Sequence, residues 1–422
     1  MKVLWITNAL LPDALAHLTK EKAESNSTGS WIVALSEALR NNQNIELFIA
    51  SATPLVEKLS VFNVNNITYY AIPKVCHVMQ YSKKYENYMT QIKEQVRPDV
   101  VHIHGTERPF GLSYVRACGN QHVVASIQGM PSVIADYYLA GLSKYDCLSN
   151  MSFHDLVMRN NPISVKRKMQ KCGQYEVELI SEINHVMGRT TWDKAHCYSI
   201  NTKINYHHCD ETLRLPFYDG QWHYDKCDKN TIFVSQASYP LKGFHILLKA
   251  LPIVIKQIPD LKVVVAGHNV TKIESIKDYF KIHSYGFFLK NEIKKRQLGK
   301  YIYFTGSLNA DQMKEQMLQA NVFVSCSSIE NSPNSLGEAQ ILGLPCVASN
   351  VGGVMDFIPS EKCGLMYRFE DYAMLAYQIV RAIQNSKTFD NTEMVYSAKK
   401  RHDYNTILHQ LLITYEKVSK NE

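Results

Sequence analysis

Short apolar runs alternate with helical patterns along the whole chain. The runs are KVLWIT, IELFIAS, DVVHIHG, HVVASIQG and INHVMG in the first half, and TIFVSQAS, LKVVVAG, YIYFTGS, ANVFVSCSS and PCVAS in the second. Runs rich in Val and Ile that lack polar alternation are typical of strands covered on both faces. The alternation predicts an α/β protein with two doubly wound parallel sheets.

The length of 422 residues is more than one typical hydrophobic core organises, so two domains are expected. The turn-rich segment LRLPFYDGQWHYDKCDKN, residues 213–230, is the predicted junction. We therefore predict a first domain over residues 1–215 and a second over 216–400. Residues 401–422 are expected to form a C-terminal helix that returns to the first domain.

Composition narrows the class of protein. A net charge of +7 is modest for this length and does not call for nucleic acid as a partner, although it permits contact with an anionic membrane surface. The apolar start, Val3 to Ile6, is too short for a signal peptide or a membrane span, so the expected location is the cytoplasm. The ten cysteines contain no CxxC pair, which argues against a zinc ribbon.

The segment SSIENSPNSLGEAQ follows the apolar run VFVSCSS and carries two carboxylates eight residues apart. Ligands of open parallel sheets bind at the carboxyl ends of strands, so Glu330 is expected in such a loop. The backbone amides of Asn334, Ser335 and Leu336 would begin the next helix and form an anion site. Glu338 would lie about one turn inside that helix, within reach of two ribose hydroxyls.

Two interpretations of these carboxylates are open at this point. In the first, the helix start binds a phosphate, Glu338 binds the ribose and Glu330 contacts the polar group that the phosphates carry, which makes the ligand a nucleotide sugar. In the second, Ser335 and Glu338 form a capping box and Glu330 is a solvated loop residue.

The segment resembles glycosyltransferases of the GT-B fold, in particular the retaining enzymes of group 1, or family 4. The matching pattern is Glu330-x7-Glu338-Ala339 followed by Gly343-Leu-Pro345. Further similar segments are YPLKGFHILLKAL with its Lys-Gly pair, STGSWIVALSEAL, DVVHIHG and GRTTWDK. The resemblance extends from residue 1 to about residue 385 and is strongest to bacterial enzymes that make surface polysaccharide.

This resemblance implies roles for individual residues. Lys242, followed by Gly243, would contact the donor diphosphate, and Gly29 with Ser30 would replace a Gly-Gly pair at the mouth of a helix near the donor. The chain departs from the family at two places. It has no Arg shortly before Lys242, for which Arg189 or Gln236 could compensate. The family's sugar-contacting His is matched by Gln128, with His104 as the nearest alternative.

The resemblance also implies a mechanism in which the leaving diphosphate helps to deprotonate the acceptor, without a protein nucleophile. We expect no cofactor and no metal, because cationic side chains and a helix dipole can stabilise the leaving group. The metal-like clusters in the sequence are His102-x-His104 and His207-His208-Cys209, and both are better interpreted as ordinary strand residues.

The sequence thus predicts an enzyme that transfers a hexose from a UDP- or GDP-sugar to a glycan or lipid-linked glycan. The first domain would bind the acceptor, and the cationic KRKMQK segment, residues 166–171, is either a contact for an anionic membrane or pyrophosphate-linked acceptor or a solvated helix face. A nucleotide-sugar epimerase of the same fold and a catalytically silent nucleotide-sugar-binding subunit are the alternatives.

Overall fold

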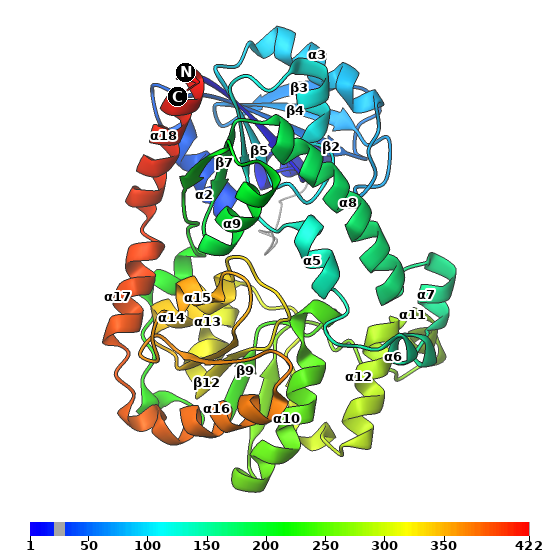
Figure 1. The fold of residues 1–422 in the computed structure, drawn as a ribbon, viewed down its shortest axis with the longest axis vertical. Coiled ribbons are helices and arrows are strands. Elements are labelled where there is room, and N and C mark those ends of the chain that lie inside the picture. Colours follow the sequence, from blue (N-terminus) through cyan, green and yellow to red (C-terminus); the bar gives the residue numbers. More distant parts are fainter. Residues whose placement is uncertain (21–29, 422) are drawn as a thin grey trace. The chain divides into compact units, whose positions relative to one another are not determined.

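The computed structural model describes the backbone of residues 1–20 and 30–421, and the side chains of residues 1–20 and 32–421. The chain divides into two compact units, which are drawn in Figure 1 with colours that follow the sequence. The first unit holds Met1–Ile134, Lys168–Thr212 and His402–Glu422, and the second holds Ala135–Arg167 and Leu213–Arg401.

The described part of the first unit is built on an eight-stranded sheet of order β3-β4-β2-β1-β5-β6-β7-β8. Every neighbouring pair is parallel except β3 and β4, which are antiparallel. The central register places Val3 beside Leu47 on one side and Val100 on the other. The strands are β1 (Lys2–Thr7), β2 (Glu46–Thr53), β3 (Ser60–Val64), β4 (Ile67–Pro73), β5 (Val100–His104), β6 (Val123–Ser126), β7 (His185–Gly188) and β8 (Asn205–His208).

Helices cover this sheet with apolar stripes. Tyr85, Met89, Ile92 and Val96 recur at helical spacing in the sequence and are buried along α3. Two of the helices, α5 and α8, contribute residues to both units. The helices with residues in the first unit are α1 (Pro12–Thr19), α2 (Ser30–Arg40), α3 (Lys84–Val96), α4 (Leu112–Cys118), α5 (Pro131–Tyr137), α8 (Pro162–Glu182), α9 (Thr191–Ile200) and α18 (Tyr404–Lys420).

The C-terminal helix α18 is anchored in the core of the first unit. The Tyr415 hydroxyl accepts a hydrogen bond from the Trp5 indole at 2.8 Å and lies 2.7 Å from Nδ1 of His102. All three side chains are buried. Burying a polar tip with satisfied partners fixes the position of the helix on the sheet.

The second unit is built on a six-stranded sheet of order β11-β10-β9-β12-β13-β14, in which all described neighbours are parallel. The prediction of two doubly wound parallel sheets is therefore confirmed. The strands are β9 (Thr231–Val234), β10 (Lys262–Val265), β11 (Ile302–Phe304), β12 (Val322–Ser325), β13 (Cys346–Ser349) and β14 (Leu365–Tyr367).

The helices of the second unit also have apolar stripes and caps. Leu247, Leu248 and Leu251 are buried on α10, which packs beside α16 (Figure 1). Asn309 and Gln312 form a capping box at the start of α13. The α-helices are α6 (Lys144–Ser149), α7 (Phe153–Met158), α10 (Phe244–Gln257), α11 (Ile276–Lys281), α12 (Ser284–Lys295), α13 (Ala310–Gln319), α14 (Asn334–Leu342), α15 (Val354–Phe357), α16 (Tyr372–Asn385) and α17 (Thr392–Arg401), joined by 3₁₀ turns that include η1 (Leu215–Asp219) and η3 (Pro240–Lys242).

The division of the chain differs from a continuous first domain over residues 1–215, because residues 135–167 join the second unit. The reason is a buried carboxylate on α7. Asp155 accepts a hydrogen bond from the backbone amide of Ser284 at 2.7 Å and from Nδ1 of His283 at 2.8 Å. These bonds join segments that are more than 120 residues apart, a pairing that sequence patterns do not reveal.

Candidate functional site

The strand order identifies where a ligand of the second unit should bind. From β9 the chain winds outward through β10 and β11, and it then returns to the other side of β9 with β12. Ligands of open α/β sheets bind outside the carboxyl ends of the strands at such a switch point. The loops that follow β9 and β12 are the two that carry the predicted donor-binding residues Gln236, Lys242 and Glu330.

Lys242 is held by a tight turn against the loop after β12. It ends η3 and precedes Gly243, whose φ of +63° lies in the left-handed region. A Cβ on Gly243 would stand 1.7 Å from the Cys326 carbonyl oxygen, so no other residue fits without a shift. The amide of Ser328 donates to the Leu241 carbonyl at 2.7 Å, which joins the two loops directly.

Lys242 and Glu330 form an ion pair at the switch point. The Lys242 ammonium lies 2.6 Å from Oε1 of Glu330, and the same oxygen accepts a hydrogen bond from the Ser327 hydroxyl at 2.6 Å. Burial lowers the pKa of Lys242, but the carboxylate of Glu330 and the Tyr239 hydroxyl outweigh it and raise the pKa overall. Lys242 therefore remains a cation, and the two side chains keep 22% and 17% of their surface exposed.

A second close approach fixes the backbone of Glu330. The Gly353 amide donates to the Glu330 carbonyl at 3.0 Å. A Cβ on the neighbouring Gly352, whose φ is +53°, would stand 1.9 Å from that carbonyl oxygen. The loop after β13 thus supports the loop after β12.

The start of α14 lies in the same region, as predicted. Pro333 precedes the helix without a side-chain cap, and the Leu336 amide donates to the Pro333 carbonyl at 2.9 Å. Because the Leu336 amide is engaged, the amides of Asn334 and Ser335 are the better placed of the three for an anion. The Ser335 hydroxyl lies 3.2 Å from the hydroxyl of Ser235, just beyond β9, which brings the helix start to the switch point.

Glu338 does not cap α14, so the capping-box interpretation is wrong. Its two carboxylate oxygens accept hydrogen bonds from Nε and Nη2 of Arg214, at 2.6 and 2.7 Å. Burial raises the pKa of Glu338, while the guanidinium of Arg214 acts in the opposite direction. The pair is almost enclosed, with exposed fractions of 4% for Glu338 and 14% for Arg214.

Arg214 is a site residue that the sequence pattern did not reveal. It precedes η1 and its guanidinium lies 4.9 Å from the centre of the Phe217 ring. Its one signal in the sequence is a lone cation between the apolar residues of LRLPF, in the predicted domain junction. Gln236, by contrast, donates to the hydroxyl of Ser238 at 3.1 Å and remains near the end of β9.

The predicted residues of the first unit lie at the carboxyl ends of β5, β6 and β7. His104 is buried, with its ring centre 3.7 Å from that of His102 and 4.3 Å from that of Trp5. Burial lowers the pKa of His104 well below its usual range, so the imidazole is neutral. This environment is that of a core residue.

Gln128 and Arg189 share one partner in the first unit. The Gln128 amide donates to Oε1 of Glu211 at 2.9 Å, and Arg189 forms an ion pair with the same carboxylate oxygen. The side chains of Arg189 and Glu211 are each 5% exposed. Of the predicted pair Gly29 and Ser30, Gly29 lies outside the described residues, and Ser30 begins α2 without a described side chain.

A small cavity lies at the carboxyl ends of β1, β2 and β4, beside the loop after β5. Its walls include Thr7 and Asn8 at the end of β1, and three side chains that can carry positive charge: Lys74, His77 and Arg108. One Nη of Arg108 donates to the Asn8 carbonyl at 3.0 Å, which holds the guanidinium against the cavity. The lining favours a polar ligand with an anionic group.

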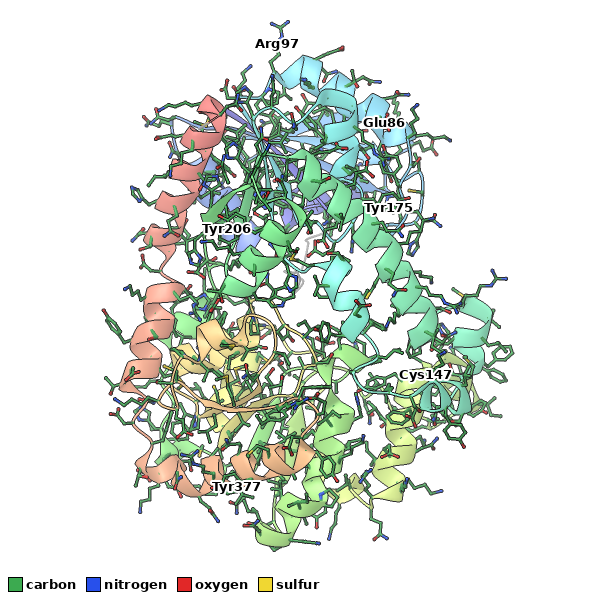
Figure 2. The ribbon with its side chains drawn as sticks, viewed as in Figure 1. Glu86, Arg97, Cys147, Tyr175, Tyr206 and Tyr377 are labelled. Carbon is green, nitrogen blue, oxygen red and sulfur yellow. The ribbon has the colours of Figure 1, made fainter. Side chains whose placement is uncertain are left out.

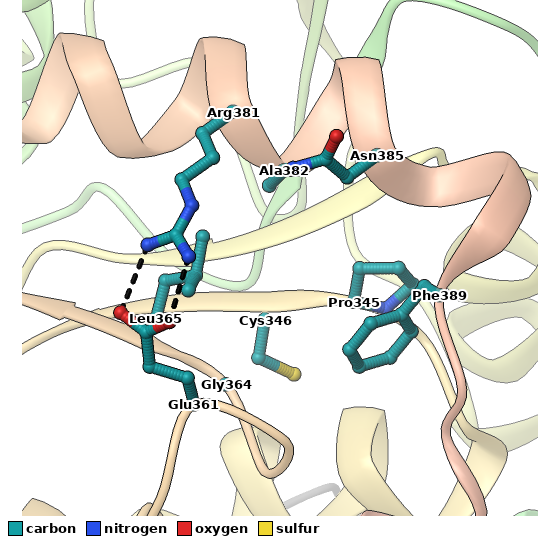
Figure 3. Close-up of a pocket in the computed structure, with 9 residues that line it drawn as sticks. All are labelled: Pro345, Cys346, Glu361, Gly364, Leu365, Arg381, Ala382, Asn385 and Phe389. Atoms are coloured by element: carbon teal, nitrogen blue, oxygen red, sulfur yellow. Dashed lines mark hydrogen bonds and ion pairs between the residues drawn. The ribbon is translucent and has the colours of Figure 1, made fainter.

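Another cavity lies at the opposite edge of the second sheet. Figure 3 shows its lining, which includes Pro345 and Cys346 at the start of β13, Leu365 at the start of β14, and the ion pair of Arg381 with Glu361. These residues lie at the amino ends of the parallel strands, whereas Lys242 and Glu330 lie beyond the carboxyl ends. The cavity is therefore separate from the switch point.

Neither metal-like pattern of the sequence forms a metal-binding group in the described part of the chain. His102 packs on His104, and His207 stacks on His185 with the ring centres 5.3 Å apart. Among the residues that the structure describes, the group that could hold an ion is His154, Asp155 and His283. It lies on α7 and before α12, where both imidazoles face the Asp155 carboxylate.

Comparisons with known proteins agree with this geometry. Residues 222–401 match the family described as glycosyl transferases group 1. Spore coat protein SA of Bacillus subtilis is 29% identical over 196 residues, which cover 45% of this chain and 49% of that protein. The chain thus spans about half the length of this curated relative.

Solved structures share the fold over the full chain. Sucrose-phosphate synthase from Thermosynechococcus elongatus superposes with a TM-score of 0.70 at 15% identity, covering 100% of both chains. HepE of Anabaena, solved with UDP and glucose, has a TM-score of 0.63 at 14% identity and covers 99% of this chain and 100% of its own. The chain therefore has the GT-B fold, and its residues 222–401 match the family described as glycosyl transferases group 1.

Proposed function

We propose that this protein is a retaining, metal-independent glycosyltransferase that moves a hexose from a nucleotide-diphosphate sugar to a hydroxyl of a glycan or lipid-linked glycan. The observation that carries the proposal is the Lys242–Glu330 pair, which meets the start of α14 at the switch point of the second sheet. A cation, a helix N-terminus and a carboxylate in one place suit a diphosphate that carries a polyhydroxylated group.

Donor binding would exchange one partner of this pair. The diphosphate would replace the Glu330 carboxylate on the Lys242 ammonium, while Glu330 would turn to accept hydroxyl hydrogen bonds from the sugar. Glu338 would bind the ribose while Arg214 holds its carboxylate in place. We assign the diphosphate contact to Lys242 rather than to Arg189, because the Arg189–Glu211 pair is almost fully desolvated.

We infer the transfer step from the sequence resemblance. The bond between the anomeric carbon and the diphosphate oxygen breaks, and the acceptor oxygen bonds to the same face of the sugar. The acceptor proton passes to the leaving phosphate. Lys242 and the α14 amides stabilise the negative charge that develops on the leaving group, so no ion is required.

The acceptor would bind in the first unit. The cavity beside Thr7, Lys74 and Arg108 supports this assignment, because it lies at the carboxyl ends of the central strands and carries donors for hydroxyl and phosphate oxygens. We propose a role in surface polysaccharide synthesis on the basis of the sequence resemblance. UDP is the first nucleotide to test, because HepE was solved with it.

The test is a calorimetric binding panel of UDP, GDP, ADP and their common sugar conjugates, with EDTA present. The proteins are the wild type, Glu338→Ala and the control Glu315→Ala, which removes an exposed carboxylate on α13. We expect one nucleotide to bind the wild type and the control without metal, and to bind Glu338→Ala more weakly. If no nucleotide binds, or if binding appears only with a divalent ion, the proposed donor site is wrong.

A second measurement separates an enzyme from a silent binding subunit. Hydrolysis of the bound sugar nucleotide, or transfer to a glycan, is expected from the enzyme in single-turnover assays. Tight binding of the nucleotide sugar with no release of nucleoside diphosphate under any acceptor would indicate a binding subunit instead. Conversion to a second sugar nucleotide without an acceptor would indicate an epimerase.

A further inference from the structure

Exposed apolar side chains are concentrated on three short helices of the second unit. Of the 23 large apolar residues that are exposed in the described part of the chain, nine lie on α6, α7 and α11, which contain six residues each. Figure 1 shows these helices gathered at one side of the unit, next to α12. They are Tyr145, Leu148, Phe153, Leu156, Val157, Met158, Ile276, Tyr279 and Phe280, which we call the α6–α7–α11 surface.

The spacing of these residues is that of buried helix faces, but the faces point to solvent. Phe153, Leu156 and Val157 occupy positions i, i+3 and i+4 of α7, and the residue that α7 buries is the polar Asp155. Ile276, Tyr279 and Phe280 repeat this spacing on α11, where no residue is buried. An amphipathic face that is turned outward indicates a partner surface.

Specific contacts hold the helices of the surface together. The rings of Phe153 and Phe280 meet edge to face, with centres 5.2 Å apart, and so join α7 to α11. Beneath them, Asp155 binds His283 and the Ser284 amide at the start of α12. The side-chain amide of Asn291 on α12 donates to Asn150, next to α6, at 2.8 Å.

The charges around the surface are arranged for an anionic partner. Lys144, Arg159, Lys277 and Lys281 are exposed on or beside the three helices. The acidic residues of the three helices are engaged in local bonds, and the exposed Glu274 before α11 forms an ion pair with Lys272. Asp146 and Asp278 complete capping boxes with Ser143 and Ser275, and Asp155 is buried in its network.

We propose that the α6–α7–α11 surface inserts into the headgroup region of an anionic membrane. Aliphatic side chains with Tyr and Phe, flanked by Lys and Arg, form the composition that suits a bilayer interface. Its apolar side chains would enter the lipid by about 5–10 Å. None of the helices in the described residues is long and apolar enough to cross a bilayer, so the contact is peripheral.

The α6–α7–α11 surface would be the contact site for a membrane whether or not the protein is a transferase. It also differs from the cationic segment 166–171, because it combines apolar and cationic groups on one face. Lipid headgroups beside the surface would supply the anionic charge that Lys144, Lys277 and Lys281 are placed to meet.

The test is cosedimentation of the full chain with phosphatidylcholine vesicles, with and without phosphatidylglycerol. The wild type should bind the anionic vesicles, and added salt should weaken that binding. The variant Leu148→Ser/Leu156→Ser/Ile276→Ser removes three side chains that are at least 58% exposed, so the fold should tolerate it. Its partition onto anionic vesicles should fall by about a hundredfold or more.

The control variant is Met374→Ser/Tyr377→Ser, which removes exposed apolar groups from α16. Figure 2 shows Tyr377 and Cys147, which is on α6, at separate places on the second unit. The control should bind vesicles like the wild type, and equal melting temperatures and nucleotide binding would show that both variants are folded.

Several outcomes would overturn the proposal. If the wild type stays in the supernatant with anionic vesicles at low salt, the protein has no membrane-binding surface. If the triple variant binds vesicles like the wild type, the membrane contact lies elsewhere on the protein. If the wild type sediments as a dimer without binding vesicles and the triple variant as a monomer, the surface binds a second copy instead. Nucleotide binding is read separately, so loss of membrane binding and failure of the proposed donor site are distinguishable.

Discussion

The carboxyl edges of the two sheets hold charged pairs of opposite character. At the edge of the second sheet, the Lys242–Glu330 pair keeps about a fifth of its surface exposed. At the edge of the first, Arg189 and Glu211 are each only 5% exposed, and His102 and His104 are buried beside them. A pair in contact with water can exchange one partner for a ligand, whereas a desolvated pair loses much more when it is separated. From this difference we infer charge exchange in the second unit and a structural role for the pair in the first.

The largest effect should come from Lys242→Ala. We expect turnover of the donor identified in the binding panel to fall by about 10²-fold or more, because a positioned cation that stabilises the leaving group is lost. The control is Lys262→Ala, which removes a lysine that is 44% exposed and paired with Asp228. Near-normal turnover of Lys242→Ala would show that Lys242 is not the diphosphate contact, and Arg189 of the first unit would then be the residue to test.

Glu338→Ala should raise the KM for the donor by about 10- to 100-fold, through loss of charge-assisted hydrogen bonds to the ribose. The change also leaves Arg214 unpaired in a nearly enclosed position, at a cost of about 3–5 kcal/mol in the free energy of unfolding. The double variant Arg214→Met/Glu338→Met separates these effects. In urea titrations the double variant should recover most of the free energy of unfolding, while its donor affinity stays low. If the donor affinity also recovers, Glu338 has a structural role and does not bind the donor.

Gly352→Ala tests whether the loop after β13 fixes Glu330. The new Cβ would meet the Glu330 carbonyl oxygen at 1.9 Å, so we expect weaker donor binding and a loss of roughly 1–3 kcal/mol in unfolding free energy. Gly306→Ala is the matched control, because its φ is +79° and no atom lies within 4 Å of the added Cβ. The control should lose some stability and keep donor affinity; equal affinity losses in both would mean that strain, not contact with Glu330, is responsible.

The smallest effect concerns Glu176, a buried acid of the first unit. Its carboxylate accepts hydrogen bonds from the amide and hydroxyl of Ser132, at 2.9 and 2.6 Å, and burial raises the pKa of Glu176 from 4.5 to about 8. The folded protein therefore holds a proton that the unfolded chain loses above pH 4.5, so stability should decline as the pH rises toward 8 and then level off. Glu176→Gln should flatten that slope in urea titrations; an unchanged slope would show that Glu176 is ionised in the fold.

Much of the fold and part of the site were predictable because they depend on local patterns. The apolar runs predicted ten of the strands. Because the carboxyl ends of parallel strands lie at one edge of a sheet, Glu330 was expected at that edge, and the sequence resemblance implied a diphosphate contact for Lys242. Four strands were missed: β3, β4, β8 and β14. β3, β8 and β14 are edge strands, where one side is unpaired and the apolar signal is weaker.

The pairing of Arg214 with Glu338 and the transfer of residues 135–167 to the second unit were not predictable. Each depends on a contact between segments more than 120 residues apart, and a single sequence contains no signal for such pairs. Gly243 and Gly352 could be noted as small residues in loops, but their necessity arises from carbonyl groups that only the fold brings near.

Local patterns in the sequence predicted the two parallel sheets, the loop that carries Glu330 and the helix start that follows it, because periodicity and turn chemistry act over a few residues. The packing of the whole chain sets which charges are exposed, which are desolvated and which apolar faces remain uncovered. The spacing of Phe153, Leu156 and Val157 is the same whether a helix face is buried or open to solvent. Burial is a property of the whole packed chain, and it is burial that separates the exchangeable pair of the second unit from the fixed pair of the first.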